Sequence, residues 1–459
     1  MGNLLKRLSC HNPVMTQKFG ADPYALVYGD RVYLYMTADT LEWDEQGKVK
    51  ENTYSSIDTI HVISSADLVN WTDHGGILAS TDKGAAKWGR NSWAPAAAYK
   101  NINGKDQFFL YFANGGNGIA VLQSDSPTGP FYDPINKPLI SRDMPSCADV
   151  TWLFDPAVLM DDDGSCYIYF GGGVPDISVC HNPGTARVAK LADDMISLDG
   201  EPQVIENVSY LFEDSGINKI GDTYYYSYCS NFNVPHDKVQ ELGFGCGEII
   251  LMKSKNPMGP FEMDHSILKN PEFFFGRGGN NHHCMFKFHD KYYMAYHTRI
   301  LEEAMGINAG YRSTNIDEVT VENGKVLPIT GTREGVKQVC MVNPYEKHPM
   351  VMASHMHQMD VKKEELVLIP KDETGWICVK GVDFGEEGAT QCLFEMAKAS
   401  AAGQVTVHLD TLVAAGAGSV SLASAEGAQI TFAEKVTGVH DLFFVFEGKG
   451  FEMKNWMFR

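Results

Sequence analysis

The segment FDPAVLMDDDGSCYIYF, residues 154–170, contains the unit from which the fold class of this chain is predicted. It joins a short apolar run, a polar turn and an aromatic run, which is typical of two antiparallel strands in a hairpin. The layout occurs five times, at intervals of 76, 58, 58 and 68 residues between the aromatic anchors of the second strands, Tyr33, Phe109, Tyr167, Tyr225 and Tyr293. Each interval is long enough for a four-stranded sheet, so the repeats predict a five-bladed β-propeller.

Two near copies of one turn, SPTGPF at 126–131 and NPMGPF at 256–261, strengthen the case for internal repetition. Helical periodicity is scarce, which favours an all-β protein. After about residue 327 the pattern changes, and from residue 365 short alternating strands with Gly and Asp turns predict a jelly-roll-like β-sandwich. The expected domains are a propeller over 1–327, which would carry catalysis, and a sandwich over 328–459.

The charge and the cysteines bear on partners and location. A formal net charge of -20 and a pI near 5.1 argue against nucleic acids and anionic membranes, because both bind basic surfaces. The chain starts without an apolar run of signal-peptide length, and no stretch has the roughly 18 to 20 apolar residues that span a bilayer. Ten cysteines without CxxC pairs suit reduced thiols, so we expect a cytoplasmic protein. The oligomeric state stays open.

Several polar residues stand about one strand upstream of the anchors. At offsets of eleven or twelve residues lie Asp22, Ala97, Asp155, Glu213 and His282. Equal offsets in repeated units would bring these residues together at the centre of the propeller. Three carboxyl groups in one pocket indicate an enzyme acting on glycosidic bonds, because that chemistry needs one protonated and one ionised carboxyl group.

The surroundings of the three acids indicate separate roles. Asp22 precedes Pro23, and its short side chain leaves room for a water molecule, so we expect it to be the general base. Glu213 follows Phe212, and partial desolvation there would raise its pKa toward that of a general acid. We expect Asp155 to orient Glu213 and to keep it protonated, because a like charge nearby disfavours ionisation.

Four further residues are candidates for ligand contact, and each has a structural alternative. His282 in GRGGNNHHCMF is either a hydrogen-bonded structural residue or a neighbour of a calcium ion on the axis, although calcium prefers oxygen ligands. Arg299 either binds a sugar hydroxyl or a catalytic carboxylate, or forms a surface salt bridge. Trp93 and Phe232 either stack on sugar rings or pack in the core.

Several of these segments together resemble a known family. FGADPYALV, NSWAPAAAY, FDPAVLM and ISSADLVNW, with the glutamate segment, are similar to glycoside hydrolase family 43 over roughly residues 10–327. The resemblance implies a five-bladed propeller and a single inverting displacement that needs no cofactor, with Asp22 as base, Asp155 as pKa modulator and Glu213 as acid. It also implies that Arg299 contacts the sugar and that His282 approaches an axial metal ion.

The C-terminal part resembles the family 6 carbohydrate-binding modules, most clearly in GWICVKGVDFGEEGA and GVHDLFFVFEGKG. Those modules usually hold a structural calcium ion with a Glu-Ala-Glu strand and an Asp-Trp pair, where this chain has HPMVMASHM and KNWMF. Hard cations need such carboxylates. We therefore expect no calcium in this module, and a scaffold role in place of carbohydrate binding.

The leading hypothesis is an inverting exo-acting hydrolase that removes α-L-arabinofuranosyl units, with β-D-xylosyl units as a second option. Its substrates would be arabinoxylo-oligosaccharides or xylo-oligosaccharides. The alternatives are a β-xylosidase as the main activity, an endo-arabinanase with an open groove, and a propeller lectin without turnover. Three buried, mutually repelling acids argue against a pure sugar binder.

Overall fold

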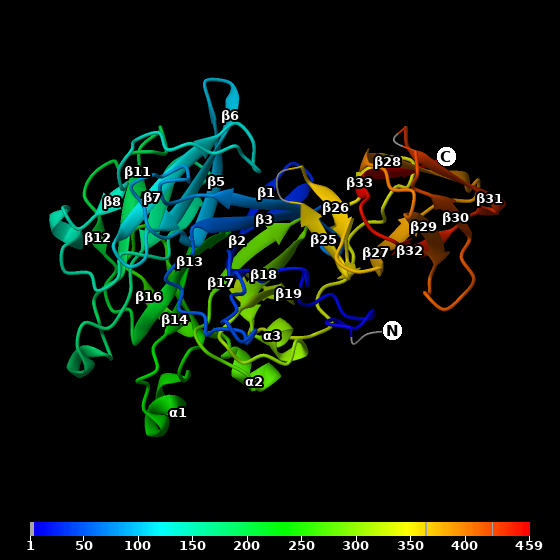
Figure 1. Cartoon of the computed structure of the whole chain (residues 1–459). Coiled ribbons are helices and arrows are strands. Elements are labelled where there is room, and N and C mark those ends of the chain that lie inside the picture. Colours follow the sequence, from blue (N-terminus) through cyan, green and yellow to red (C-terminus); the bar gives the residue numbers. More distant parts are fainter. Residues whose placement is uncertain (1–3, 363–364, 425) are drawn as a thin grey trace.

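The computed structural model describes residues 4–362, 365–424 and 426–459 (Figure 1). Regular structure is nearly all strand, which confirms the all-β prediction. The α-helices of these ranges are one-turn elements between strands: α1 (Val239–Leu242), α2 (Pro271–Phe275) and α3 (Ile300–Ala304). None of them is long and apolar enough to cross a membrane.

Five sheets make up the larger part of the molecule, and each is built mainly from strands consecutive in the sequence. The first holds β1 (Ala21–Tyr28), β2 (Arg31–Thr37), β3 (Thr59–Ser65), β4 (Trp71–Leu78) and the distant β23 (Met352–Ala353). The second holds β5 (Trp93–Ile102), β6 (Lys105–Ala113), β7 (Gly118–Ser124) and β8 (Ile140–Ser141). The third holds β9 (Ala157–Met160), β10 (Cys166–Phe170), β11 (Arg187–Leu191) and β12 (Gln203–Val204).

The fourth sheet holds β13 (Leu211–Ile220), β14 (Thr223–Ser230), β15 (Ile249–Ser254) and β16 (Glu262–Leu268). The fifth holds β17 (His283–Phe288), β18 (Lys291–Thr298) and β19 (Ser313–Val319). A short hairpin follows, made of β20 (Val321–Glu322) and β21 (Lys325–Val326).

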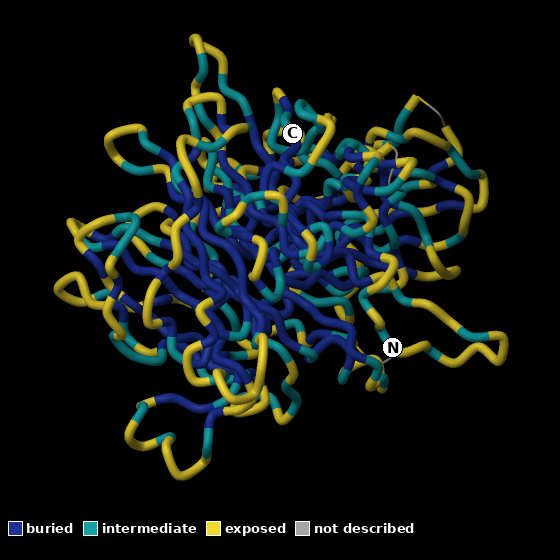
Figure 2. The backbone as a smooth tube through the Cα atoms, turned by 90° about the vertical axis from the view of Figure 1, so that its left-hand side faces the viewer, coloured by how far each residue is buried: buried dark blue, intermediate teal, exposed yellow. Residues whose placement is uncertain are grey.

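The five sheets are arranged as a ring. Their first strands touch in sequence: β1 contacts β5 and β17, β9 contacts β5 and β13, and β13 contacts β17. A cluster of buried apolar side chains fills each of the five interfaces between neighbouring sheets. In β10, Ile168 packs against the preceding sheet and Tyr169 against the following one, because successive side chains of a strand point to opposite faces. The buried strands therefore converge on the centre of the ring, and the loops lie outside (Figure 2).

The near-copy turns occupy equivalent places in the ring. The hydroxyl of Tyr35 donates to the carbonyl of Pro127 at 2.5 Å, and the hydroxyl of Tyr169 donates to that of Pro257 at 2.5 Å. In both cases the tyrosine lies in the second strand of the preceding sheet. The repetition seen in the sequence is thus a repetition of contacts.

Two further sheets pack face to face around one apolar core and form a β-sandwich. The first contains β22 (His348–Pro349), β25 (Met359–Lys362), β26 (Val367–Pro370), β28 (Ala389–Lys398), β31 (Ala428–Val436) and β33 (Glu452–Phe458). The second contains β24 (His355–His357), β27 (Thr374–Asp383), β29 (Gln404–Leu409), β30 (Gly418–Ser421) and β32 (Val439–Glu447).

The sandwich is tied to the first sheet of the ring (Figure 1). Strand β23, which leads into the sandwich, pairs with β4. The side chain of Asn70 donates to the carbonyl of Lys380 at 2.9 Å and accepts from its N–H at 2.8 Å. Because the side-chain amide of Asn70 in the ring pairs with both backbone polar groups of Lys380 in the sandwich, the sandwich is held in a defined position against the ring.

Candidate active site

The pairing of the strands shows which residues upstream of the anchors are equivalent, and it corrects two of the five predicted from the sequence. The anchors pair with Leu26, Ala98, Leu159, Asn218 and Phe286 of the first strands. Four positions before these partners lie Asp22, Ala94, Asp155, Asp214 and His282. The equivalence of Ala97 and Glu213 with the others is therefore wrong: Ala94 and Asp214 hold those positions. The hairpins differ in length: the anchor lies seven residues after its partner in the first, fourth and fifth sheets, eight in the third and eleven in the second. A constant sequence offset does not follow these differences.

Four of these equivalent residues share a left-handed backbone. The φ angles are 47° at Asp22, 38° at Ala94, 51° at Asp155 and 70° at Asp214. Non-glycine residues seldom adopt this conformation, and it gathers at functional sites. In the fourth sheet the residue just before it, Glu213, lines the central cavity, whereas the carboxylate of Asp214 contacts His282 and His283.

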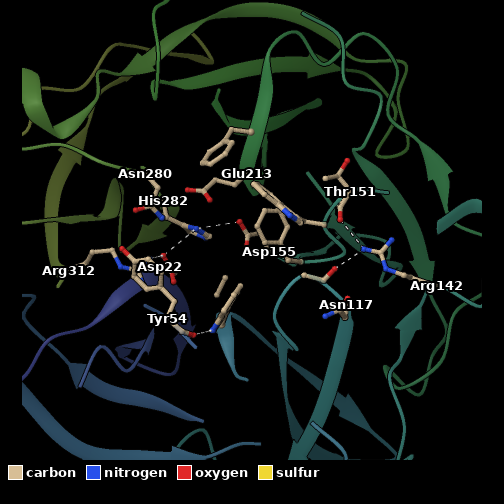
Figure 3. A pocket seen from close by; sticks show the side chains of 16 residues that line it. Asp22, Tyr54, Asn117, Arg142, Thr151, Asp155, Glu213, Asn280, His282 and Arg312 are labelled. Carbon is tan, nitrogen blue, oxygen red and sulfur yellow. Dashed lines mark hydrogen bonds and ion pairs between the residues drawn. The ribbon is translucent and has the colours of Figure 1, made fainter. Parts of the chain in front are cut away.

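The central cavity has a volume of about 580 Å³, a size that suits a small-molecule or oligosaccharide site (Figure 3). Of the predicted site residues, Asp22, Trp93, Asp155, Glu213 and His282 line it. Sequence reasoning did not single out the remaining lining residues, which are Tyr54, Ala94, Gly116, Asn117, Arg142, Thr151, Trp152, Phe154, Phe212, Asn280 and Arg312. The ring thus brings the three predicted acids to one cavity.

Asp22 is held as a carboxylate. Its Oδ1 lies 2.9 Å from Nη1 of Arg312 and 3.1 Å from Nδ1 of His297. Burial by itself would raise the pKa of Asp22, but the charge of Arg312 and the hydrogen bond from His297 outweigh it and hold the pKa well below its usual range. Asp22 is therefore ionised across the pH range in which enzymes work.

The pKa values of Asp155 and Glu213 are shifted in the opposite direction from that of Asp22. Burial raises the pKa of each well above its usual value, and the charge of Asp22 adds to the effect on both. Asp155 also raises the pKa of Glu213, and its Oδ2 accepts the backbone N–H of Asp214 at 2.9 Å. Oε1 of Glu213 is buried and has no hydrogen-bond partner among the described residues. A protonated carboxyl group therefore faces the cavity.

Arg312 is one of the functional residues that the sequence pattern did not reveal. It precedes β19, lies between Asp22 and Asp39, and binds Asp39 through Nε at 2.9 Å and Nη2 at 2.9 Å. Its guanidinium also stacks on the ring of Tyr54, 4.7 Å from the centroid. Because Arg312 stands at no fixed offset from an aromatic anchor, the repeat pattern carried no signal for it.

The other predicted contact residues lie in different settings. Arg299 is not among the cavity-lining residues; its Nε is 4.0 Å from Oε1 of the buried Glu302. Phe232 is 49% exposed, and its ring packs edge-on at 5.5 Å against Phe212, which does line the cavity. Trp93 lines the cavity and donates its indole N–H to the carbonyl of Tyr54 at 2.9 Å. The structure therefore places Trp93 at the site and the other two outside its wall.

The residues around His282 do not fit a calcium site. Nδ1 of His282 is 3.6 Å from Asp22 and 3.8 Å from Asp155, and Nε2 is 3.2 Å from Asp214. Both nitrogens thus face carboxylates of the protein, and burial lowers the pKa of the ring so that it stays neutral. Calcium takes six to eight oxygen ligands. Within residues 4–362, 365–424 and 426–459, no three His, Cys, Asp or Glu side chains are grouped to hold a metal ion.

Chelation is expected to leave hydrolysis unchanged, because the axial imidazole is held by carboxylates of the chain. The measurement compares initial rates on an aryl arabinofuranoside before and after dialysis against EDTA, and again after calcium is added. A loss of rate on dialysis that calcium restores would contradict the prediction.

The site defines a class of protein: one ionised and one protonated carboxyl group in a central cavity are the parts of a glycoside hydrolase. Residues 10–326 match the model of glycosyl hydrolases family 43, and residues 358–459 match that of carbohydrate binding module family 6. The chain belongs to glycosyl hydrolase family 43.

Two similar proteins extend over nearly the whole chain. An arabinoxylan arabinofuranohydrolase of Paenibacillus polymyxa is 44% identical over 96% of this chain and 72% of its own length. One of Bacillus subtilis (strain 168) is 41% identical over 99% of this chain and 93% of its own. Among solved structures, a family 43 arabinoxylan arabinofuranohydrolase from Bacillus subtilis in complex with cellotetraose superposes with a TM-score of 0.93, at 40% identity and 99% coverage of both chains.

Proposed function

We propose that this protein is an inverting, exo-acting glycosidase that releases α-L-arabinofuranosyl units from oligosaccharides derived from arabinoxylan. The observation that carries the proposal is the opposite protonation of Asp22 and Glu213 in one cavity. The ring of five sheets is, in this proposal, the five-bladed β-propeller of family 43. The choice of arabinofuranosyl is supported by the arabinoxylan arabinofuranohydrolases that match almost the whole chain.

The reaction is a single displacement. Glu213 donates its proton to the oxygen of the leaving xylose as the glycosidic C–O bond breaks. A water molecule attacks the anomeric carbon from the opposite side, and Asp22 takes its proton. Asp155 keeps Glu213 protonated before the reaction, and Arg312 keeps Asp22 ionised. No step uses a metal ion.

Product analysis tests the substrate class. Wild-type enzyme is incubated with arabinoxylo-oligosaccharides and, in parallel, with unsubstituted xylobiose and with debranched arabinan, and the products are separated by chromatography. The proposal expects free arabinose and an intact xylose backbone from the first substrate. Faster release of xylose from xylobiose would favour a β-xylosidase, and arabino-oligosaccharides from debranched arabinan would favour an endo-arabinanase.

The stereochemistry of the first product is expected to be inverted. Direct attack by water on an α-L-arabinofuranoside yields β-L-arabinofuranose before mutarotation, because a single displacement reverses the configuration once. Proton NMR of the anomeric signal during the first minutes checks this. Initial appearance of the α-anomer would require two displacements, and the water-activating role of Asp22 would then be wrong.

The sandwich and the location are the remaining parts of the proposal. A scaffold role for the sandwich is supported by the strand and the paired hydrogen bonds that tie it to the ring. Its match to a carbohydrate-binding family makes sugar binding the alternative role, which binding of xylan by the full chain with a blocked active site would reveal. The cytoplasmic location stays a prediction, and the ten free cysteines suit it.

A further inference from the structure

Asp214 lies at the centre of the ring, directly after Glu213, and its side chain has no exposed surface. It occupies the register position held by Asp22 in the first sheet and Asp155 in the third. It does not line the cavity, so substrate does not touch it. Asp214 is thus a buried carboxylate with a left-handed backbone that takes no direct part in the reaction, so its role must be sought in its contacts.

The carboxylate of Asp214 is fully engaged by two histidines. Its Oδ1 accepts the backbone N–H of His283 at 3.1 Å and lies 3.2 Å from Nε2 of His282. Its Oδ2 lies 2.5 Å from Nδ1 of His283. The other nitrogen of His283 is 2.8 Å from Oγ of Ser227, so the ring of His283 is fixed at both ends.

Through these contacts Asp214 reaches all three acids of the cavity. Its backbone N–H binds Asp155, and its peptide bond joins it to Glu213. Its carboxylate holds His282, whose Nδ1 stands between Asp22 at 3.6 Å and Asp155 at 3.8 Å (Figure 3). The imidazole of His282 therefore separates the carboxyl groups of Asp22 and Asp155. Asp214 holds this imidazole through its other nitrogen, Nε2.

We propose that Asp214 is a positioning residue that sets the separation of Asp22 from Asp155 by holding His282 in place. The inference rests on the proposed function, because it concerns the alignment of the same acids. Misplacing a reacting group by about 1 Å is enough to cost on the order of 100-fold in rate.

Two variants separate this role from a purely structural one. Asp214→Gly removes the carboxylate and keeps the backbone N–H, and glycine adopts a positive φ without strain. If Asp214 served only the turn, this variant would be as active as wild type and at least as stable. Asp214→Asn keeps the shape and the tolerance of the left-handed region but removes the charge, and it serves if the glycine variant does not fold.

The chain offers a matched control in Asp410 of the sandwich. Asp410 also has a positive φ, 62°, and its Oδ2 also pairs with a histidine, Nδ1 of His440, at 2.8 Å. Asp410→Gly makes the same chemical change far from the cavity. It is expected to leave kcat and KM unchanged.

For Asp214→Gly we expect kcat to fall about 100-fold with KM nearly unchanged, and for Asp214→Asn a smaller fall of the same kind. The loss is expected to be equal on arabinoxylo-oligosaccharides and on an aryl arabinofuranoside, because misplacing the base matters whatever the leaving group. Thermal unfolding checks that both variants are folded. Wild-type kcat in a folded Asp214→Gly variant overturns the positioning role, as does a change confined to KM.

The proposed function fails by a different result. If Glu213→Gln hydrolyses arabinoxylo-oligosaccharides at the wild-type rate, the glycosidase mechanism itself is wrong. If Glu213→Gln is inactive while both Asp214 variants keep full kcat, the mechanism stands and only the role of Asp214 falls.

Discussion

Glu213→Gln is expected to lower kcat on arabinoxylo-oligosaccharides by about 10³-fold and to lower it far less on an aryl arabinofuranoside. A xylose oxygen needs a proton in order to leave, and general acid catalysis contributes typically 10²–10⁴-fold. A phenolate with a low pKa leaves without that proton. The ratio of the two effects, measured on one enzyme preparation, therefore reports the acid role of Glu213 and is insensitive to the fraction of folded protein.

The pH dependence gives a second measure of the same group. Glu213 acts in its protonated form, and burial together with the charges of Asp155 and Asp22 raises its pKa. Activity is therefore retained at pH values above the ordinary range of a glutamic acid and lost as the pH rises through the elevated pKa. In Glu213→Gln, the residual activity on the aryl substrate should lack this alkaline limb.

Glu248→Gln is the matched control for this experiment. Glu248 directly precedes β15 of the fourth sheet and is as buried as Glu213, with 7% of each residue exposed. Unlike Glu213, it pairs with Lys269 at 2.9 Å and does not line the cavity. Its replacement is expected to leave the ratio of the two substrates unchanged. Equal losses on both substrates in Glu213→Gln would count against Glu213 as the proton donor.

The fold class followed from the sequence because its signal is repeated. Each hairpin carries an aromatic anchor after a polar turn, and five weak local patterns at similar spacing reinforce one another. The strand that attaches the sandwich to the ring is less evident. Strand β23 joins the first sheet from more than 270 residues away, since Met352 pairs with Thr72. No local sequence pattern predicts a strand pairing over that distance in the chain.

The acids could be found in the sequence, but their arrangement could not. Asp22 and Asp155 stand before prolines at true register positions, so the offset located them for the right reason. Glu213 was found by an offset of twelve residues, which fits the longer hairpin of the third sheet. In the fourth sheet Tyr225 pairs with Asn218, and the equivalent offset of eleven marks Asp214. Asp214 was passed over for the same reason. Hairpin length sets the distance between an anchor and its partner, and a constant offset does not follow it.

Arg299 and Arg312 show the limit for contacts across the ring. Both lie in the connection between β18 and β19 of the fifth sheet, Arg299 at its start and Arg312 at its end, and the sequence offers no physical ground for choosing between them. Arg312 reaches Asp22 because Asp39, which follows β2 beside the start of β1, also binds its guanidinium. That arrangement joins segments about 270 residues apart, and only the closure of the ring creates it.

Asp22→Ala is expected to lower kcat by about 10³-fold on both arabinoxylo-oligosaccharides and the aryl arabinofuranoside. The attacking water must lose a proton whatever the leaving group, so the good leaving group gives no relief. The fold should survive, because Arg312 keeps its paired bonds to Asp39 when Asp22 is lost. The measurement is the initial rate of Asp22→Ala on each substrate, and thermal unfolding checks that the variant is folded.

Azide makes the test of Asp22 specific. The truncated side chain leaves space for a small anion, and azide attacks carbon without needing a base, so it should restore consumption of the aryl substrate in Asp22→Ala. The product expected from a single displacement is the β-L-arabinofuranosyl azide. Asp73→Ala, which removes a buried acid of the same sheet that is paired with Lys18 outside the cavity, should neither lose turnover nor respond to azide. An α-configured azide, or rescue that is absent while Asp22→Ala stays folded, would remove Asp22 from the role of general base.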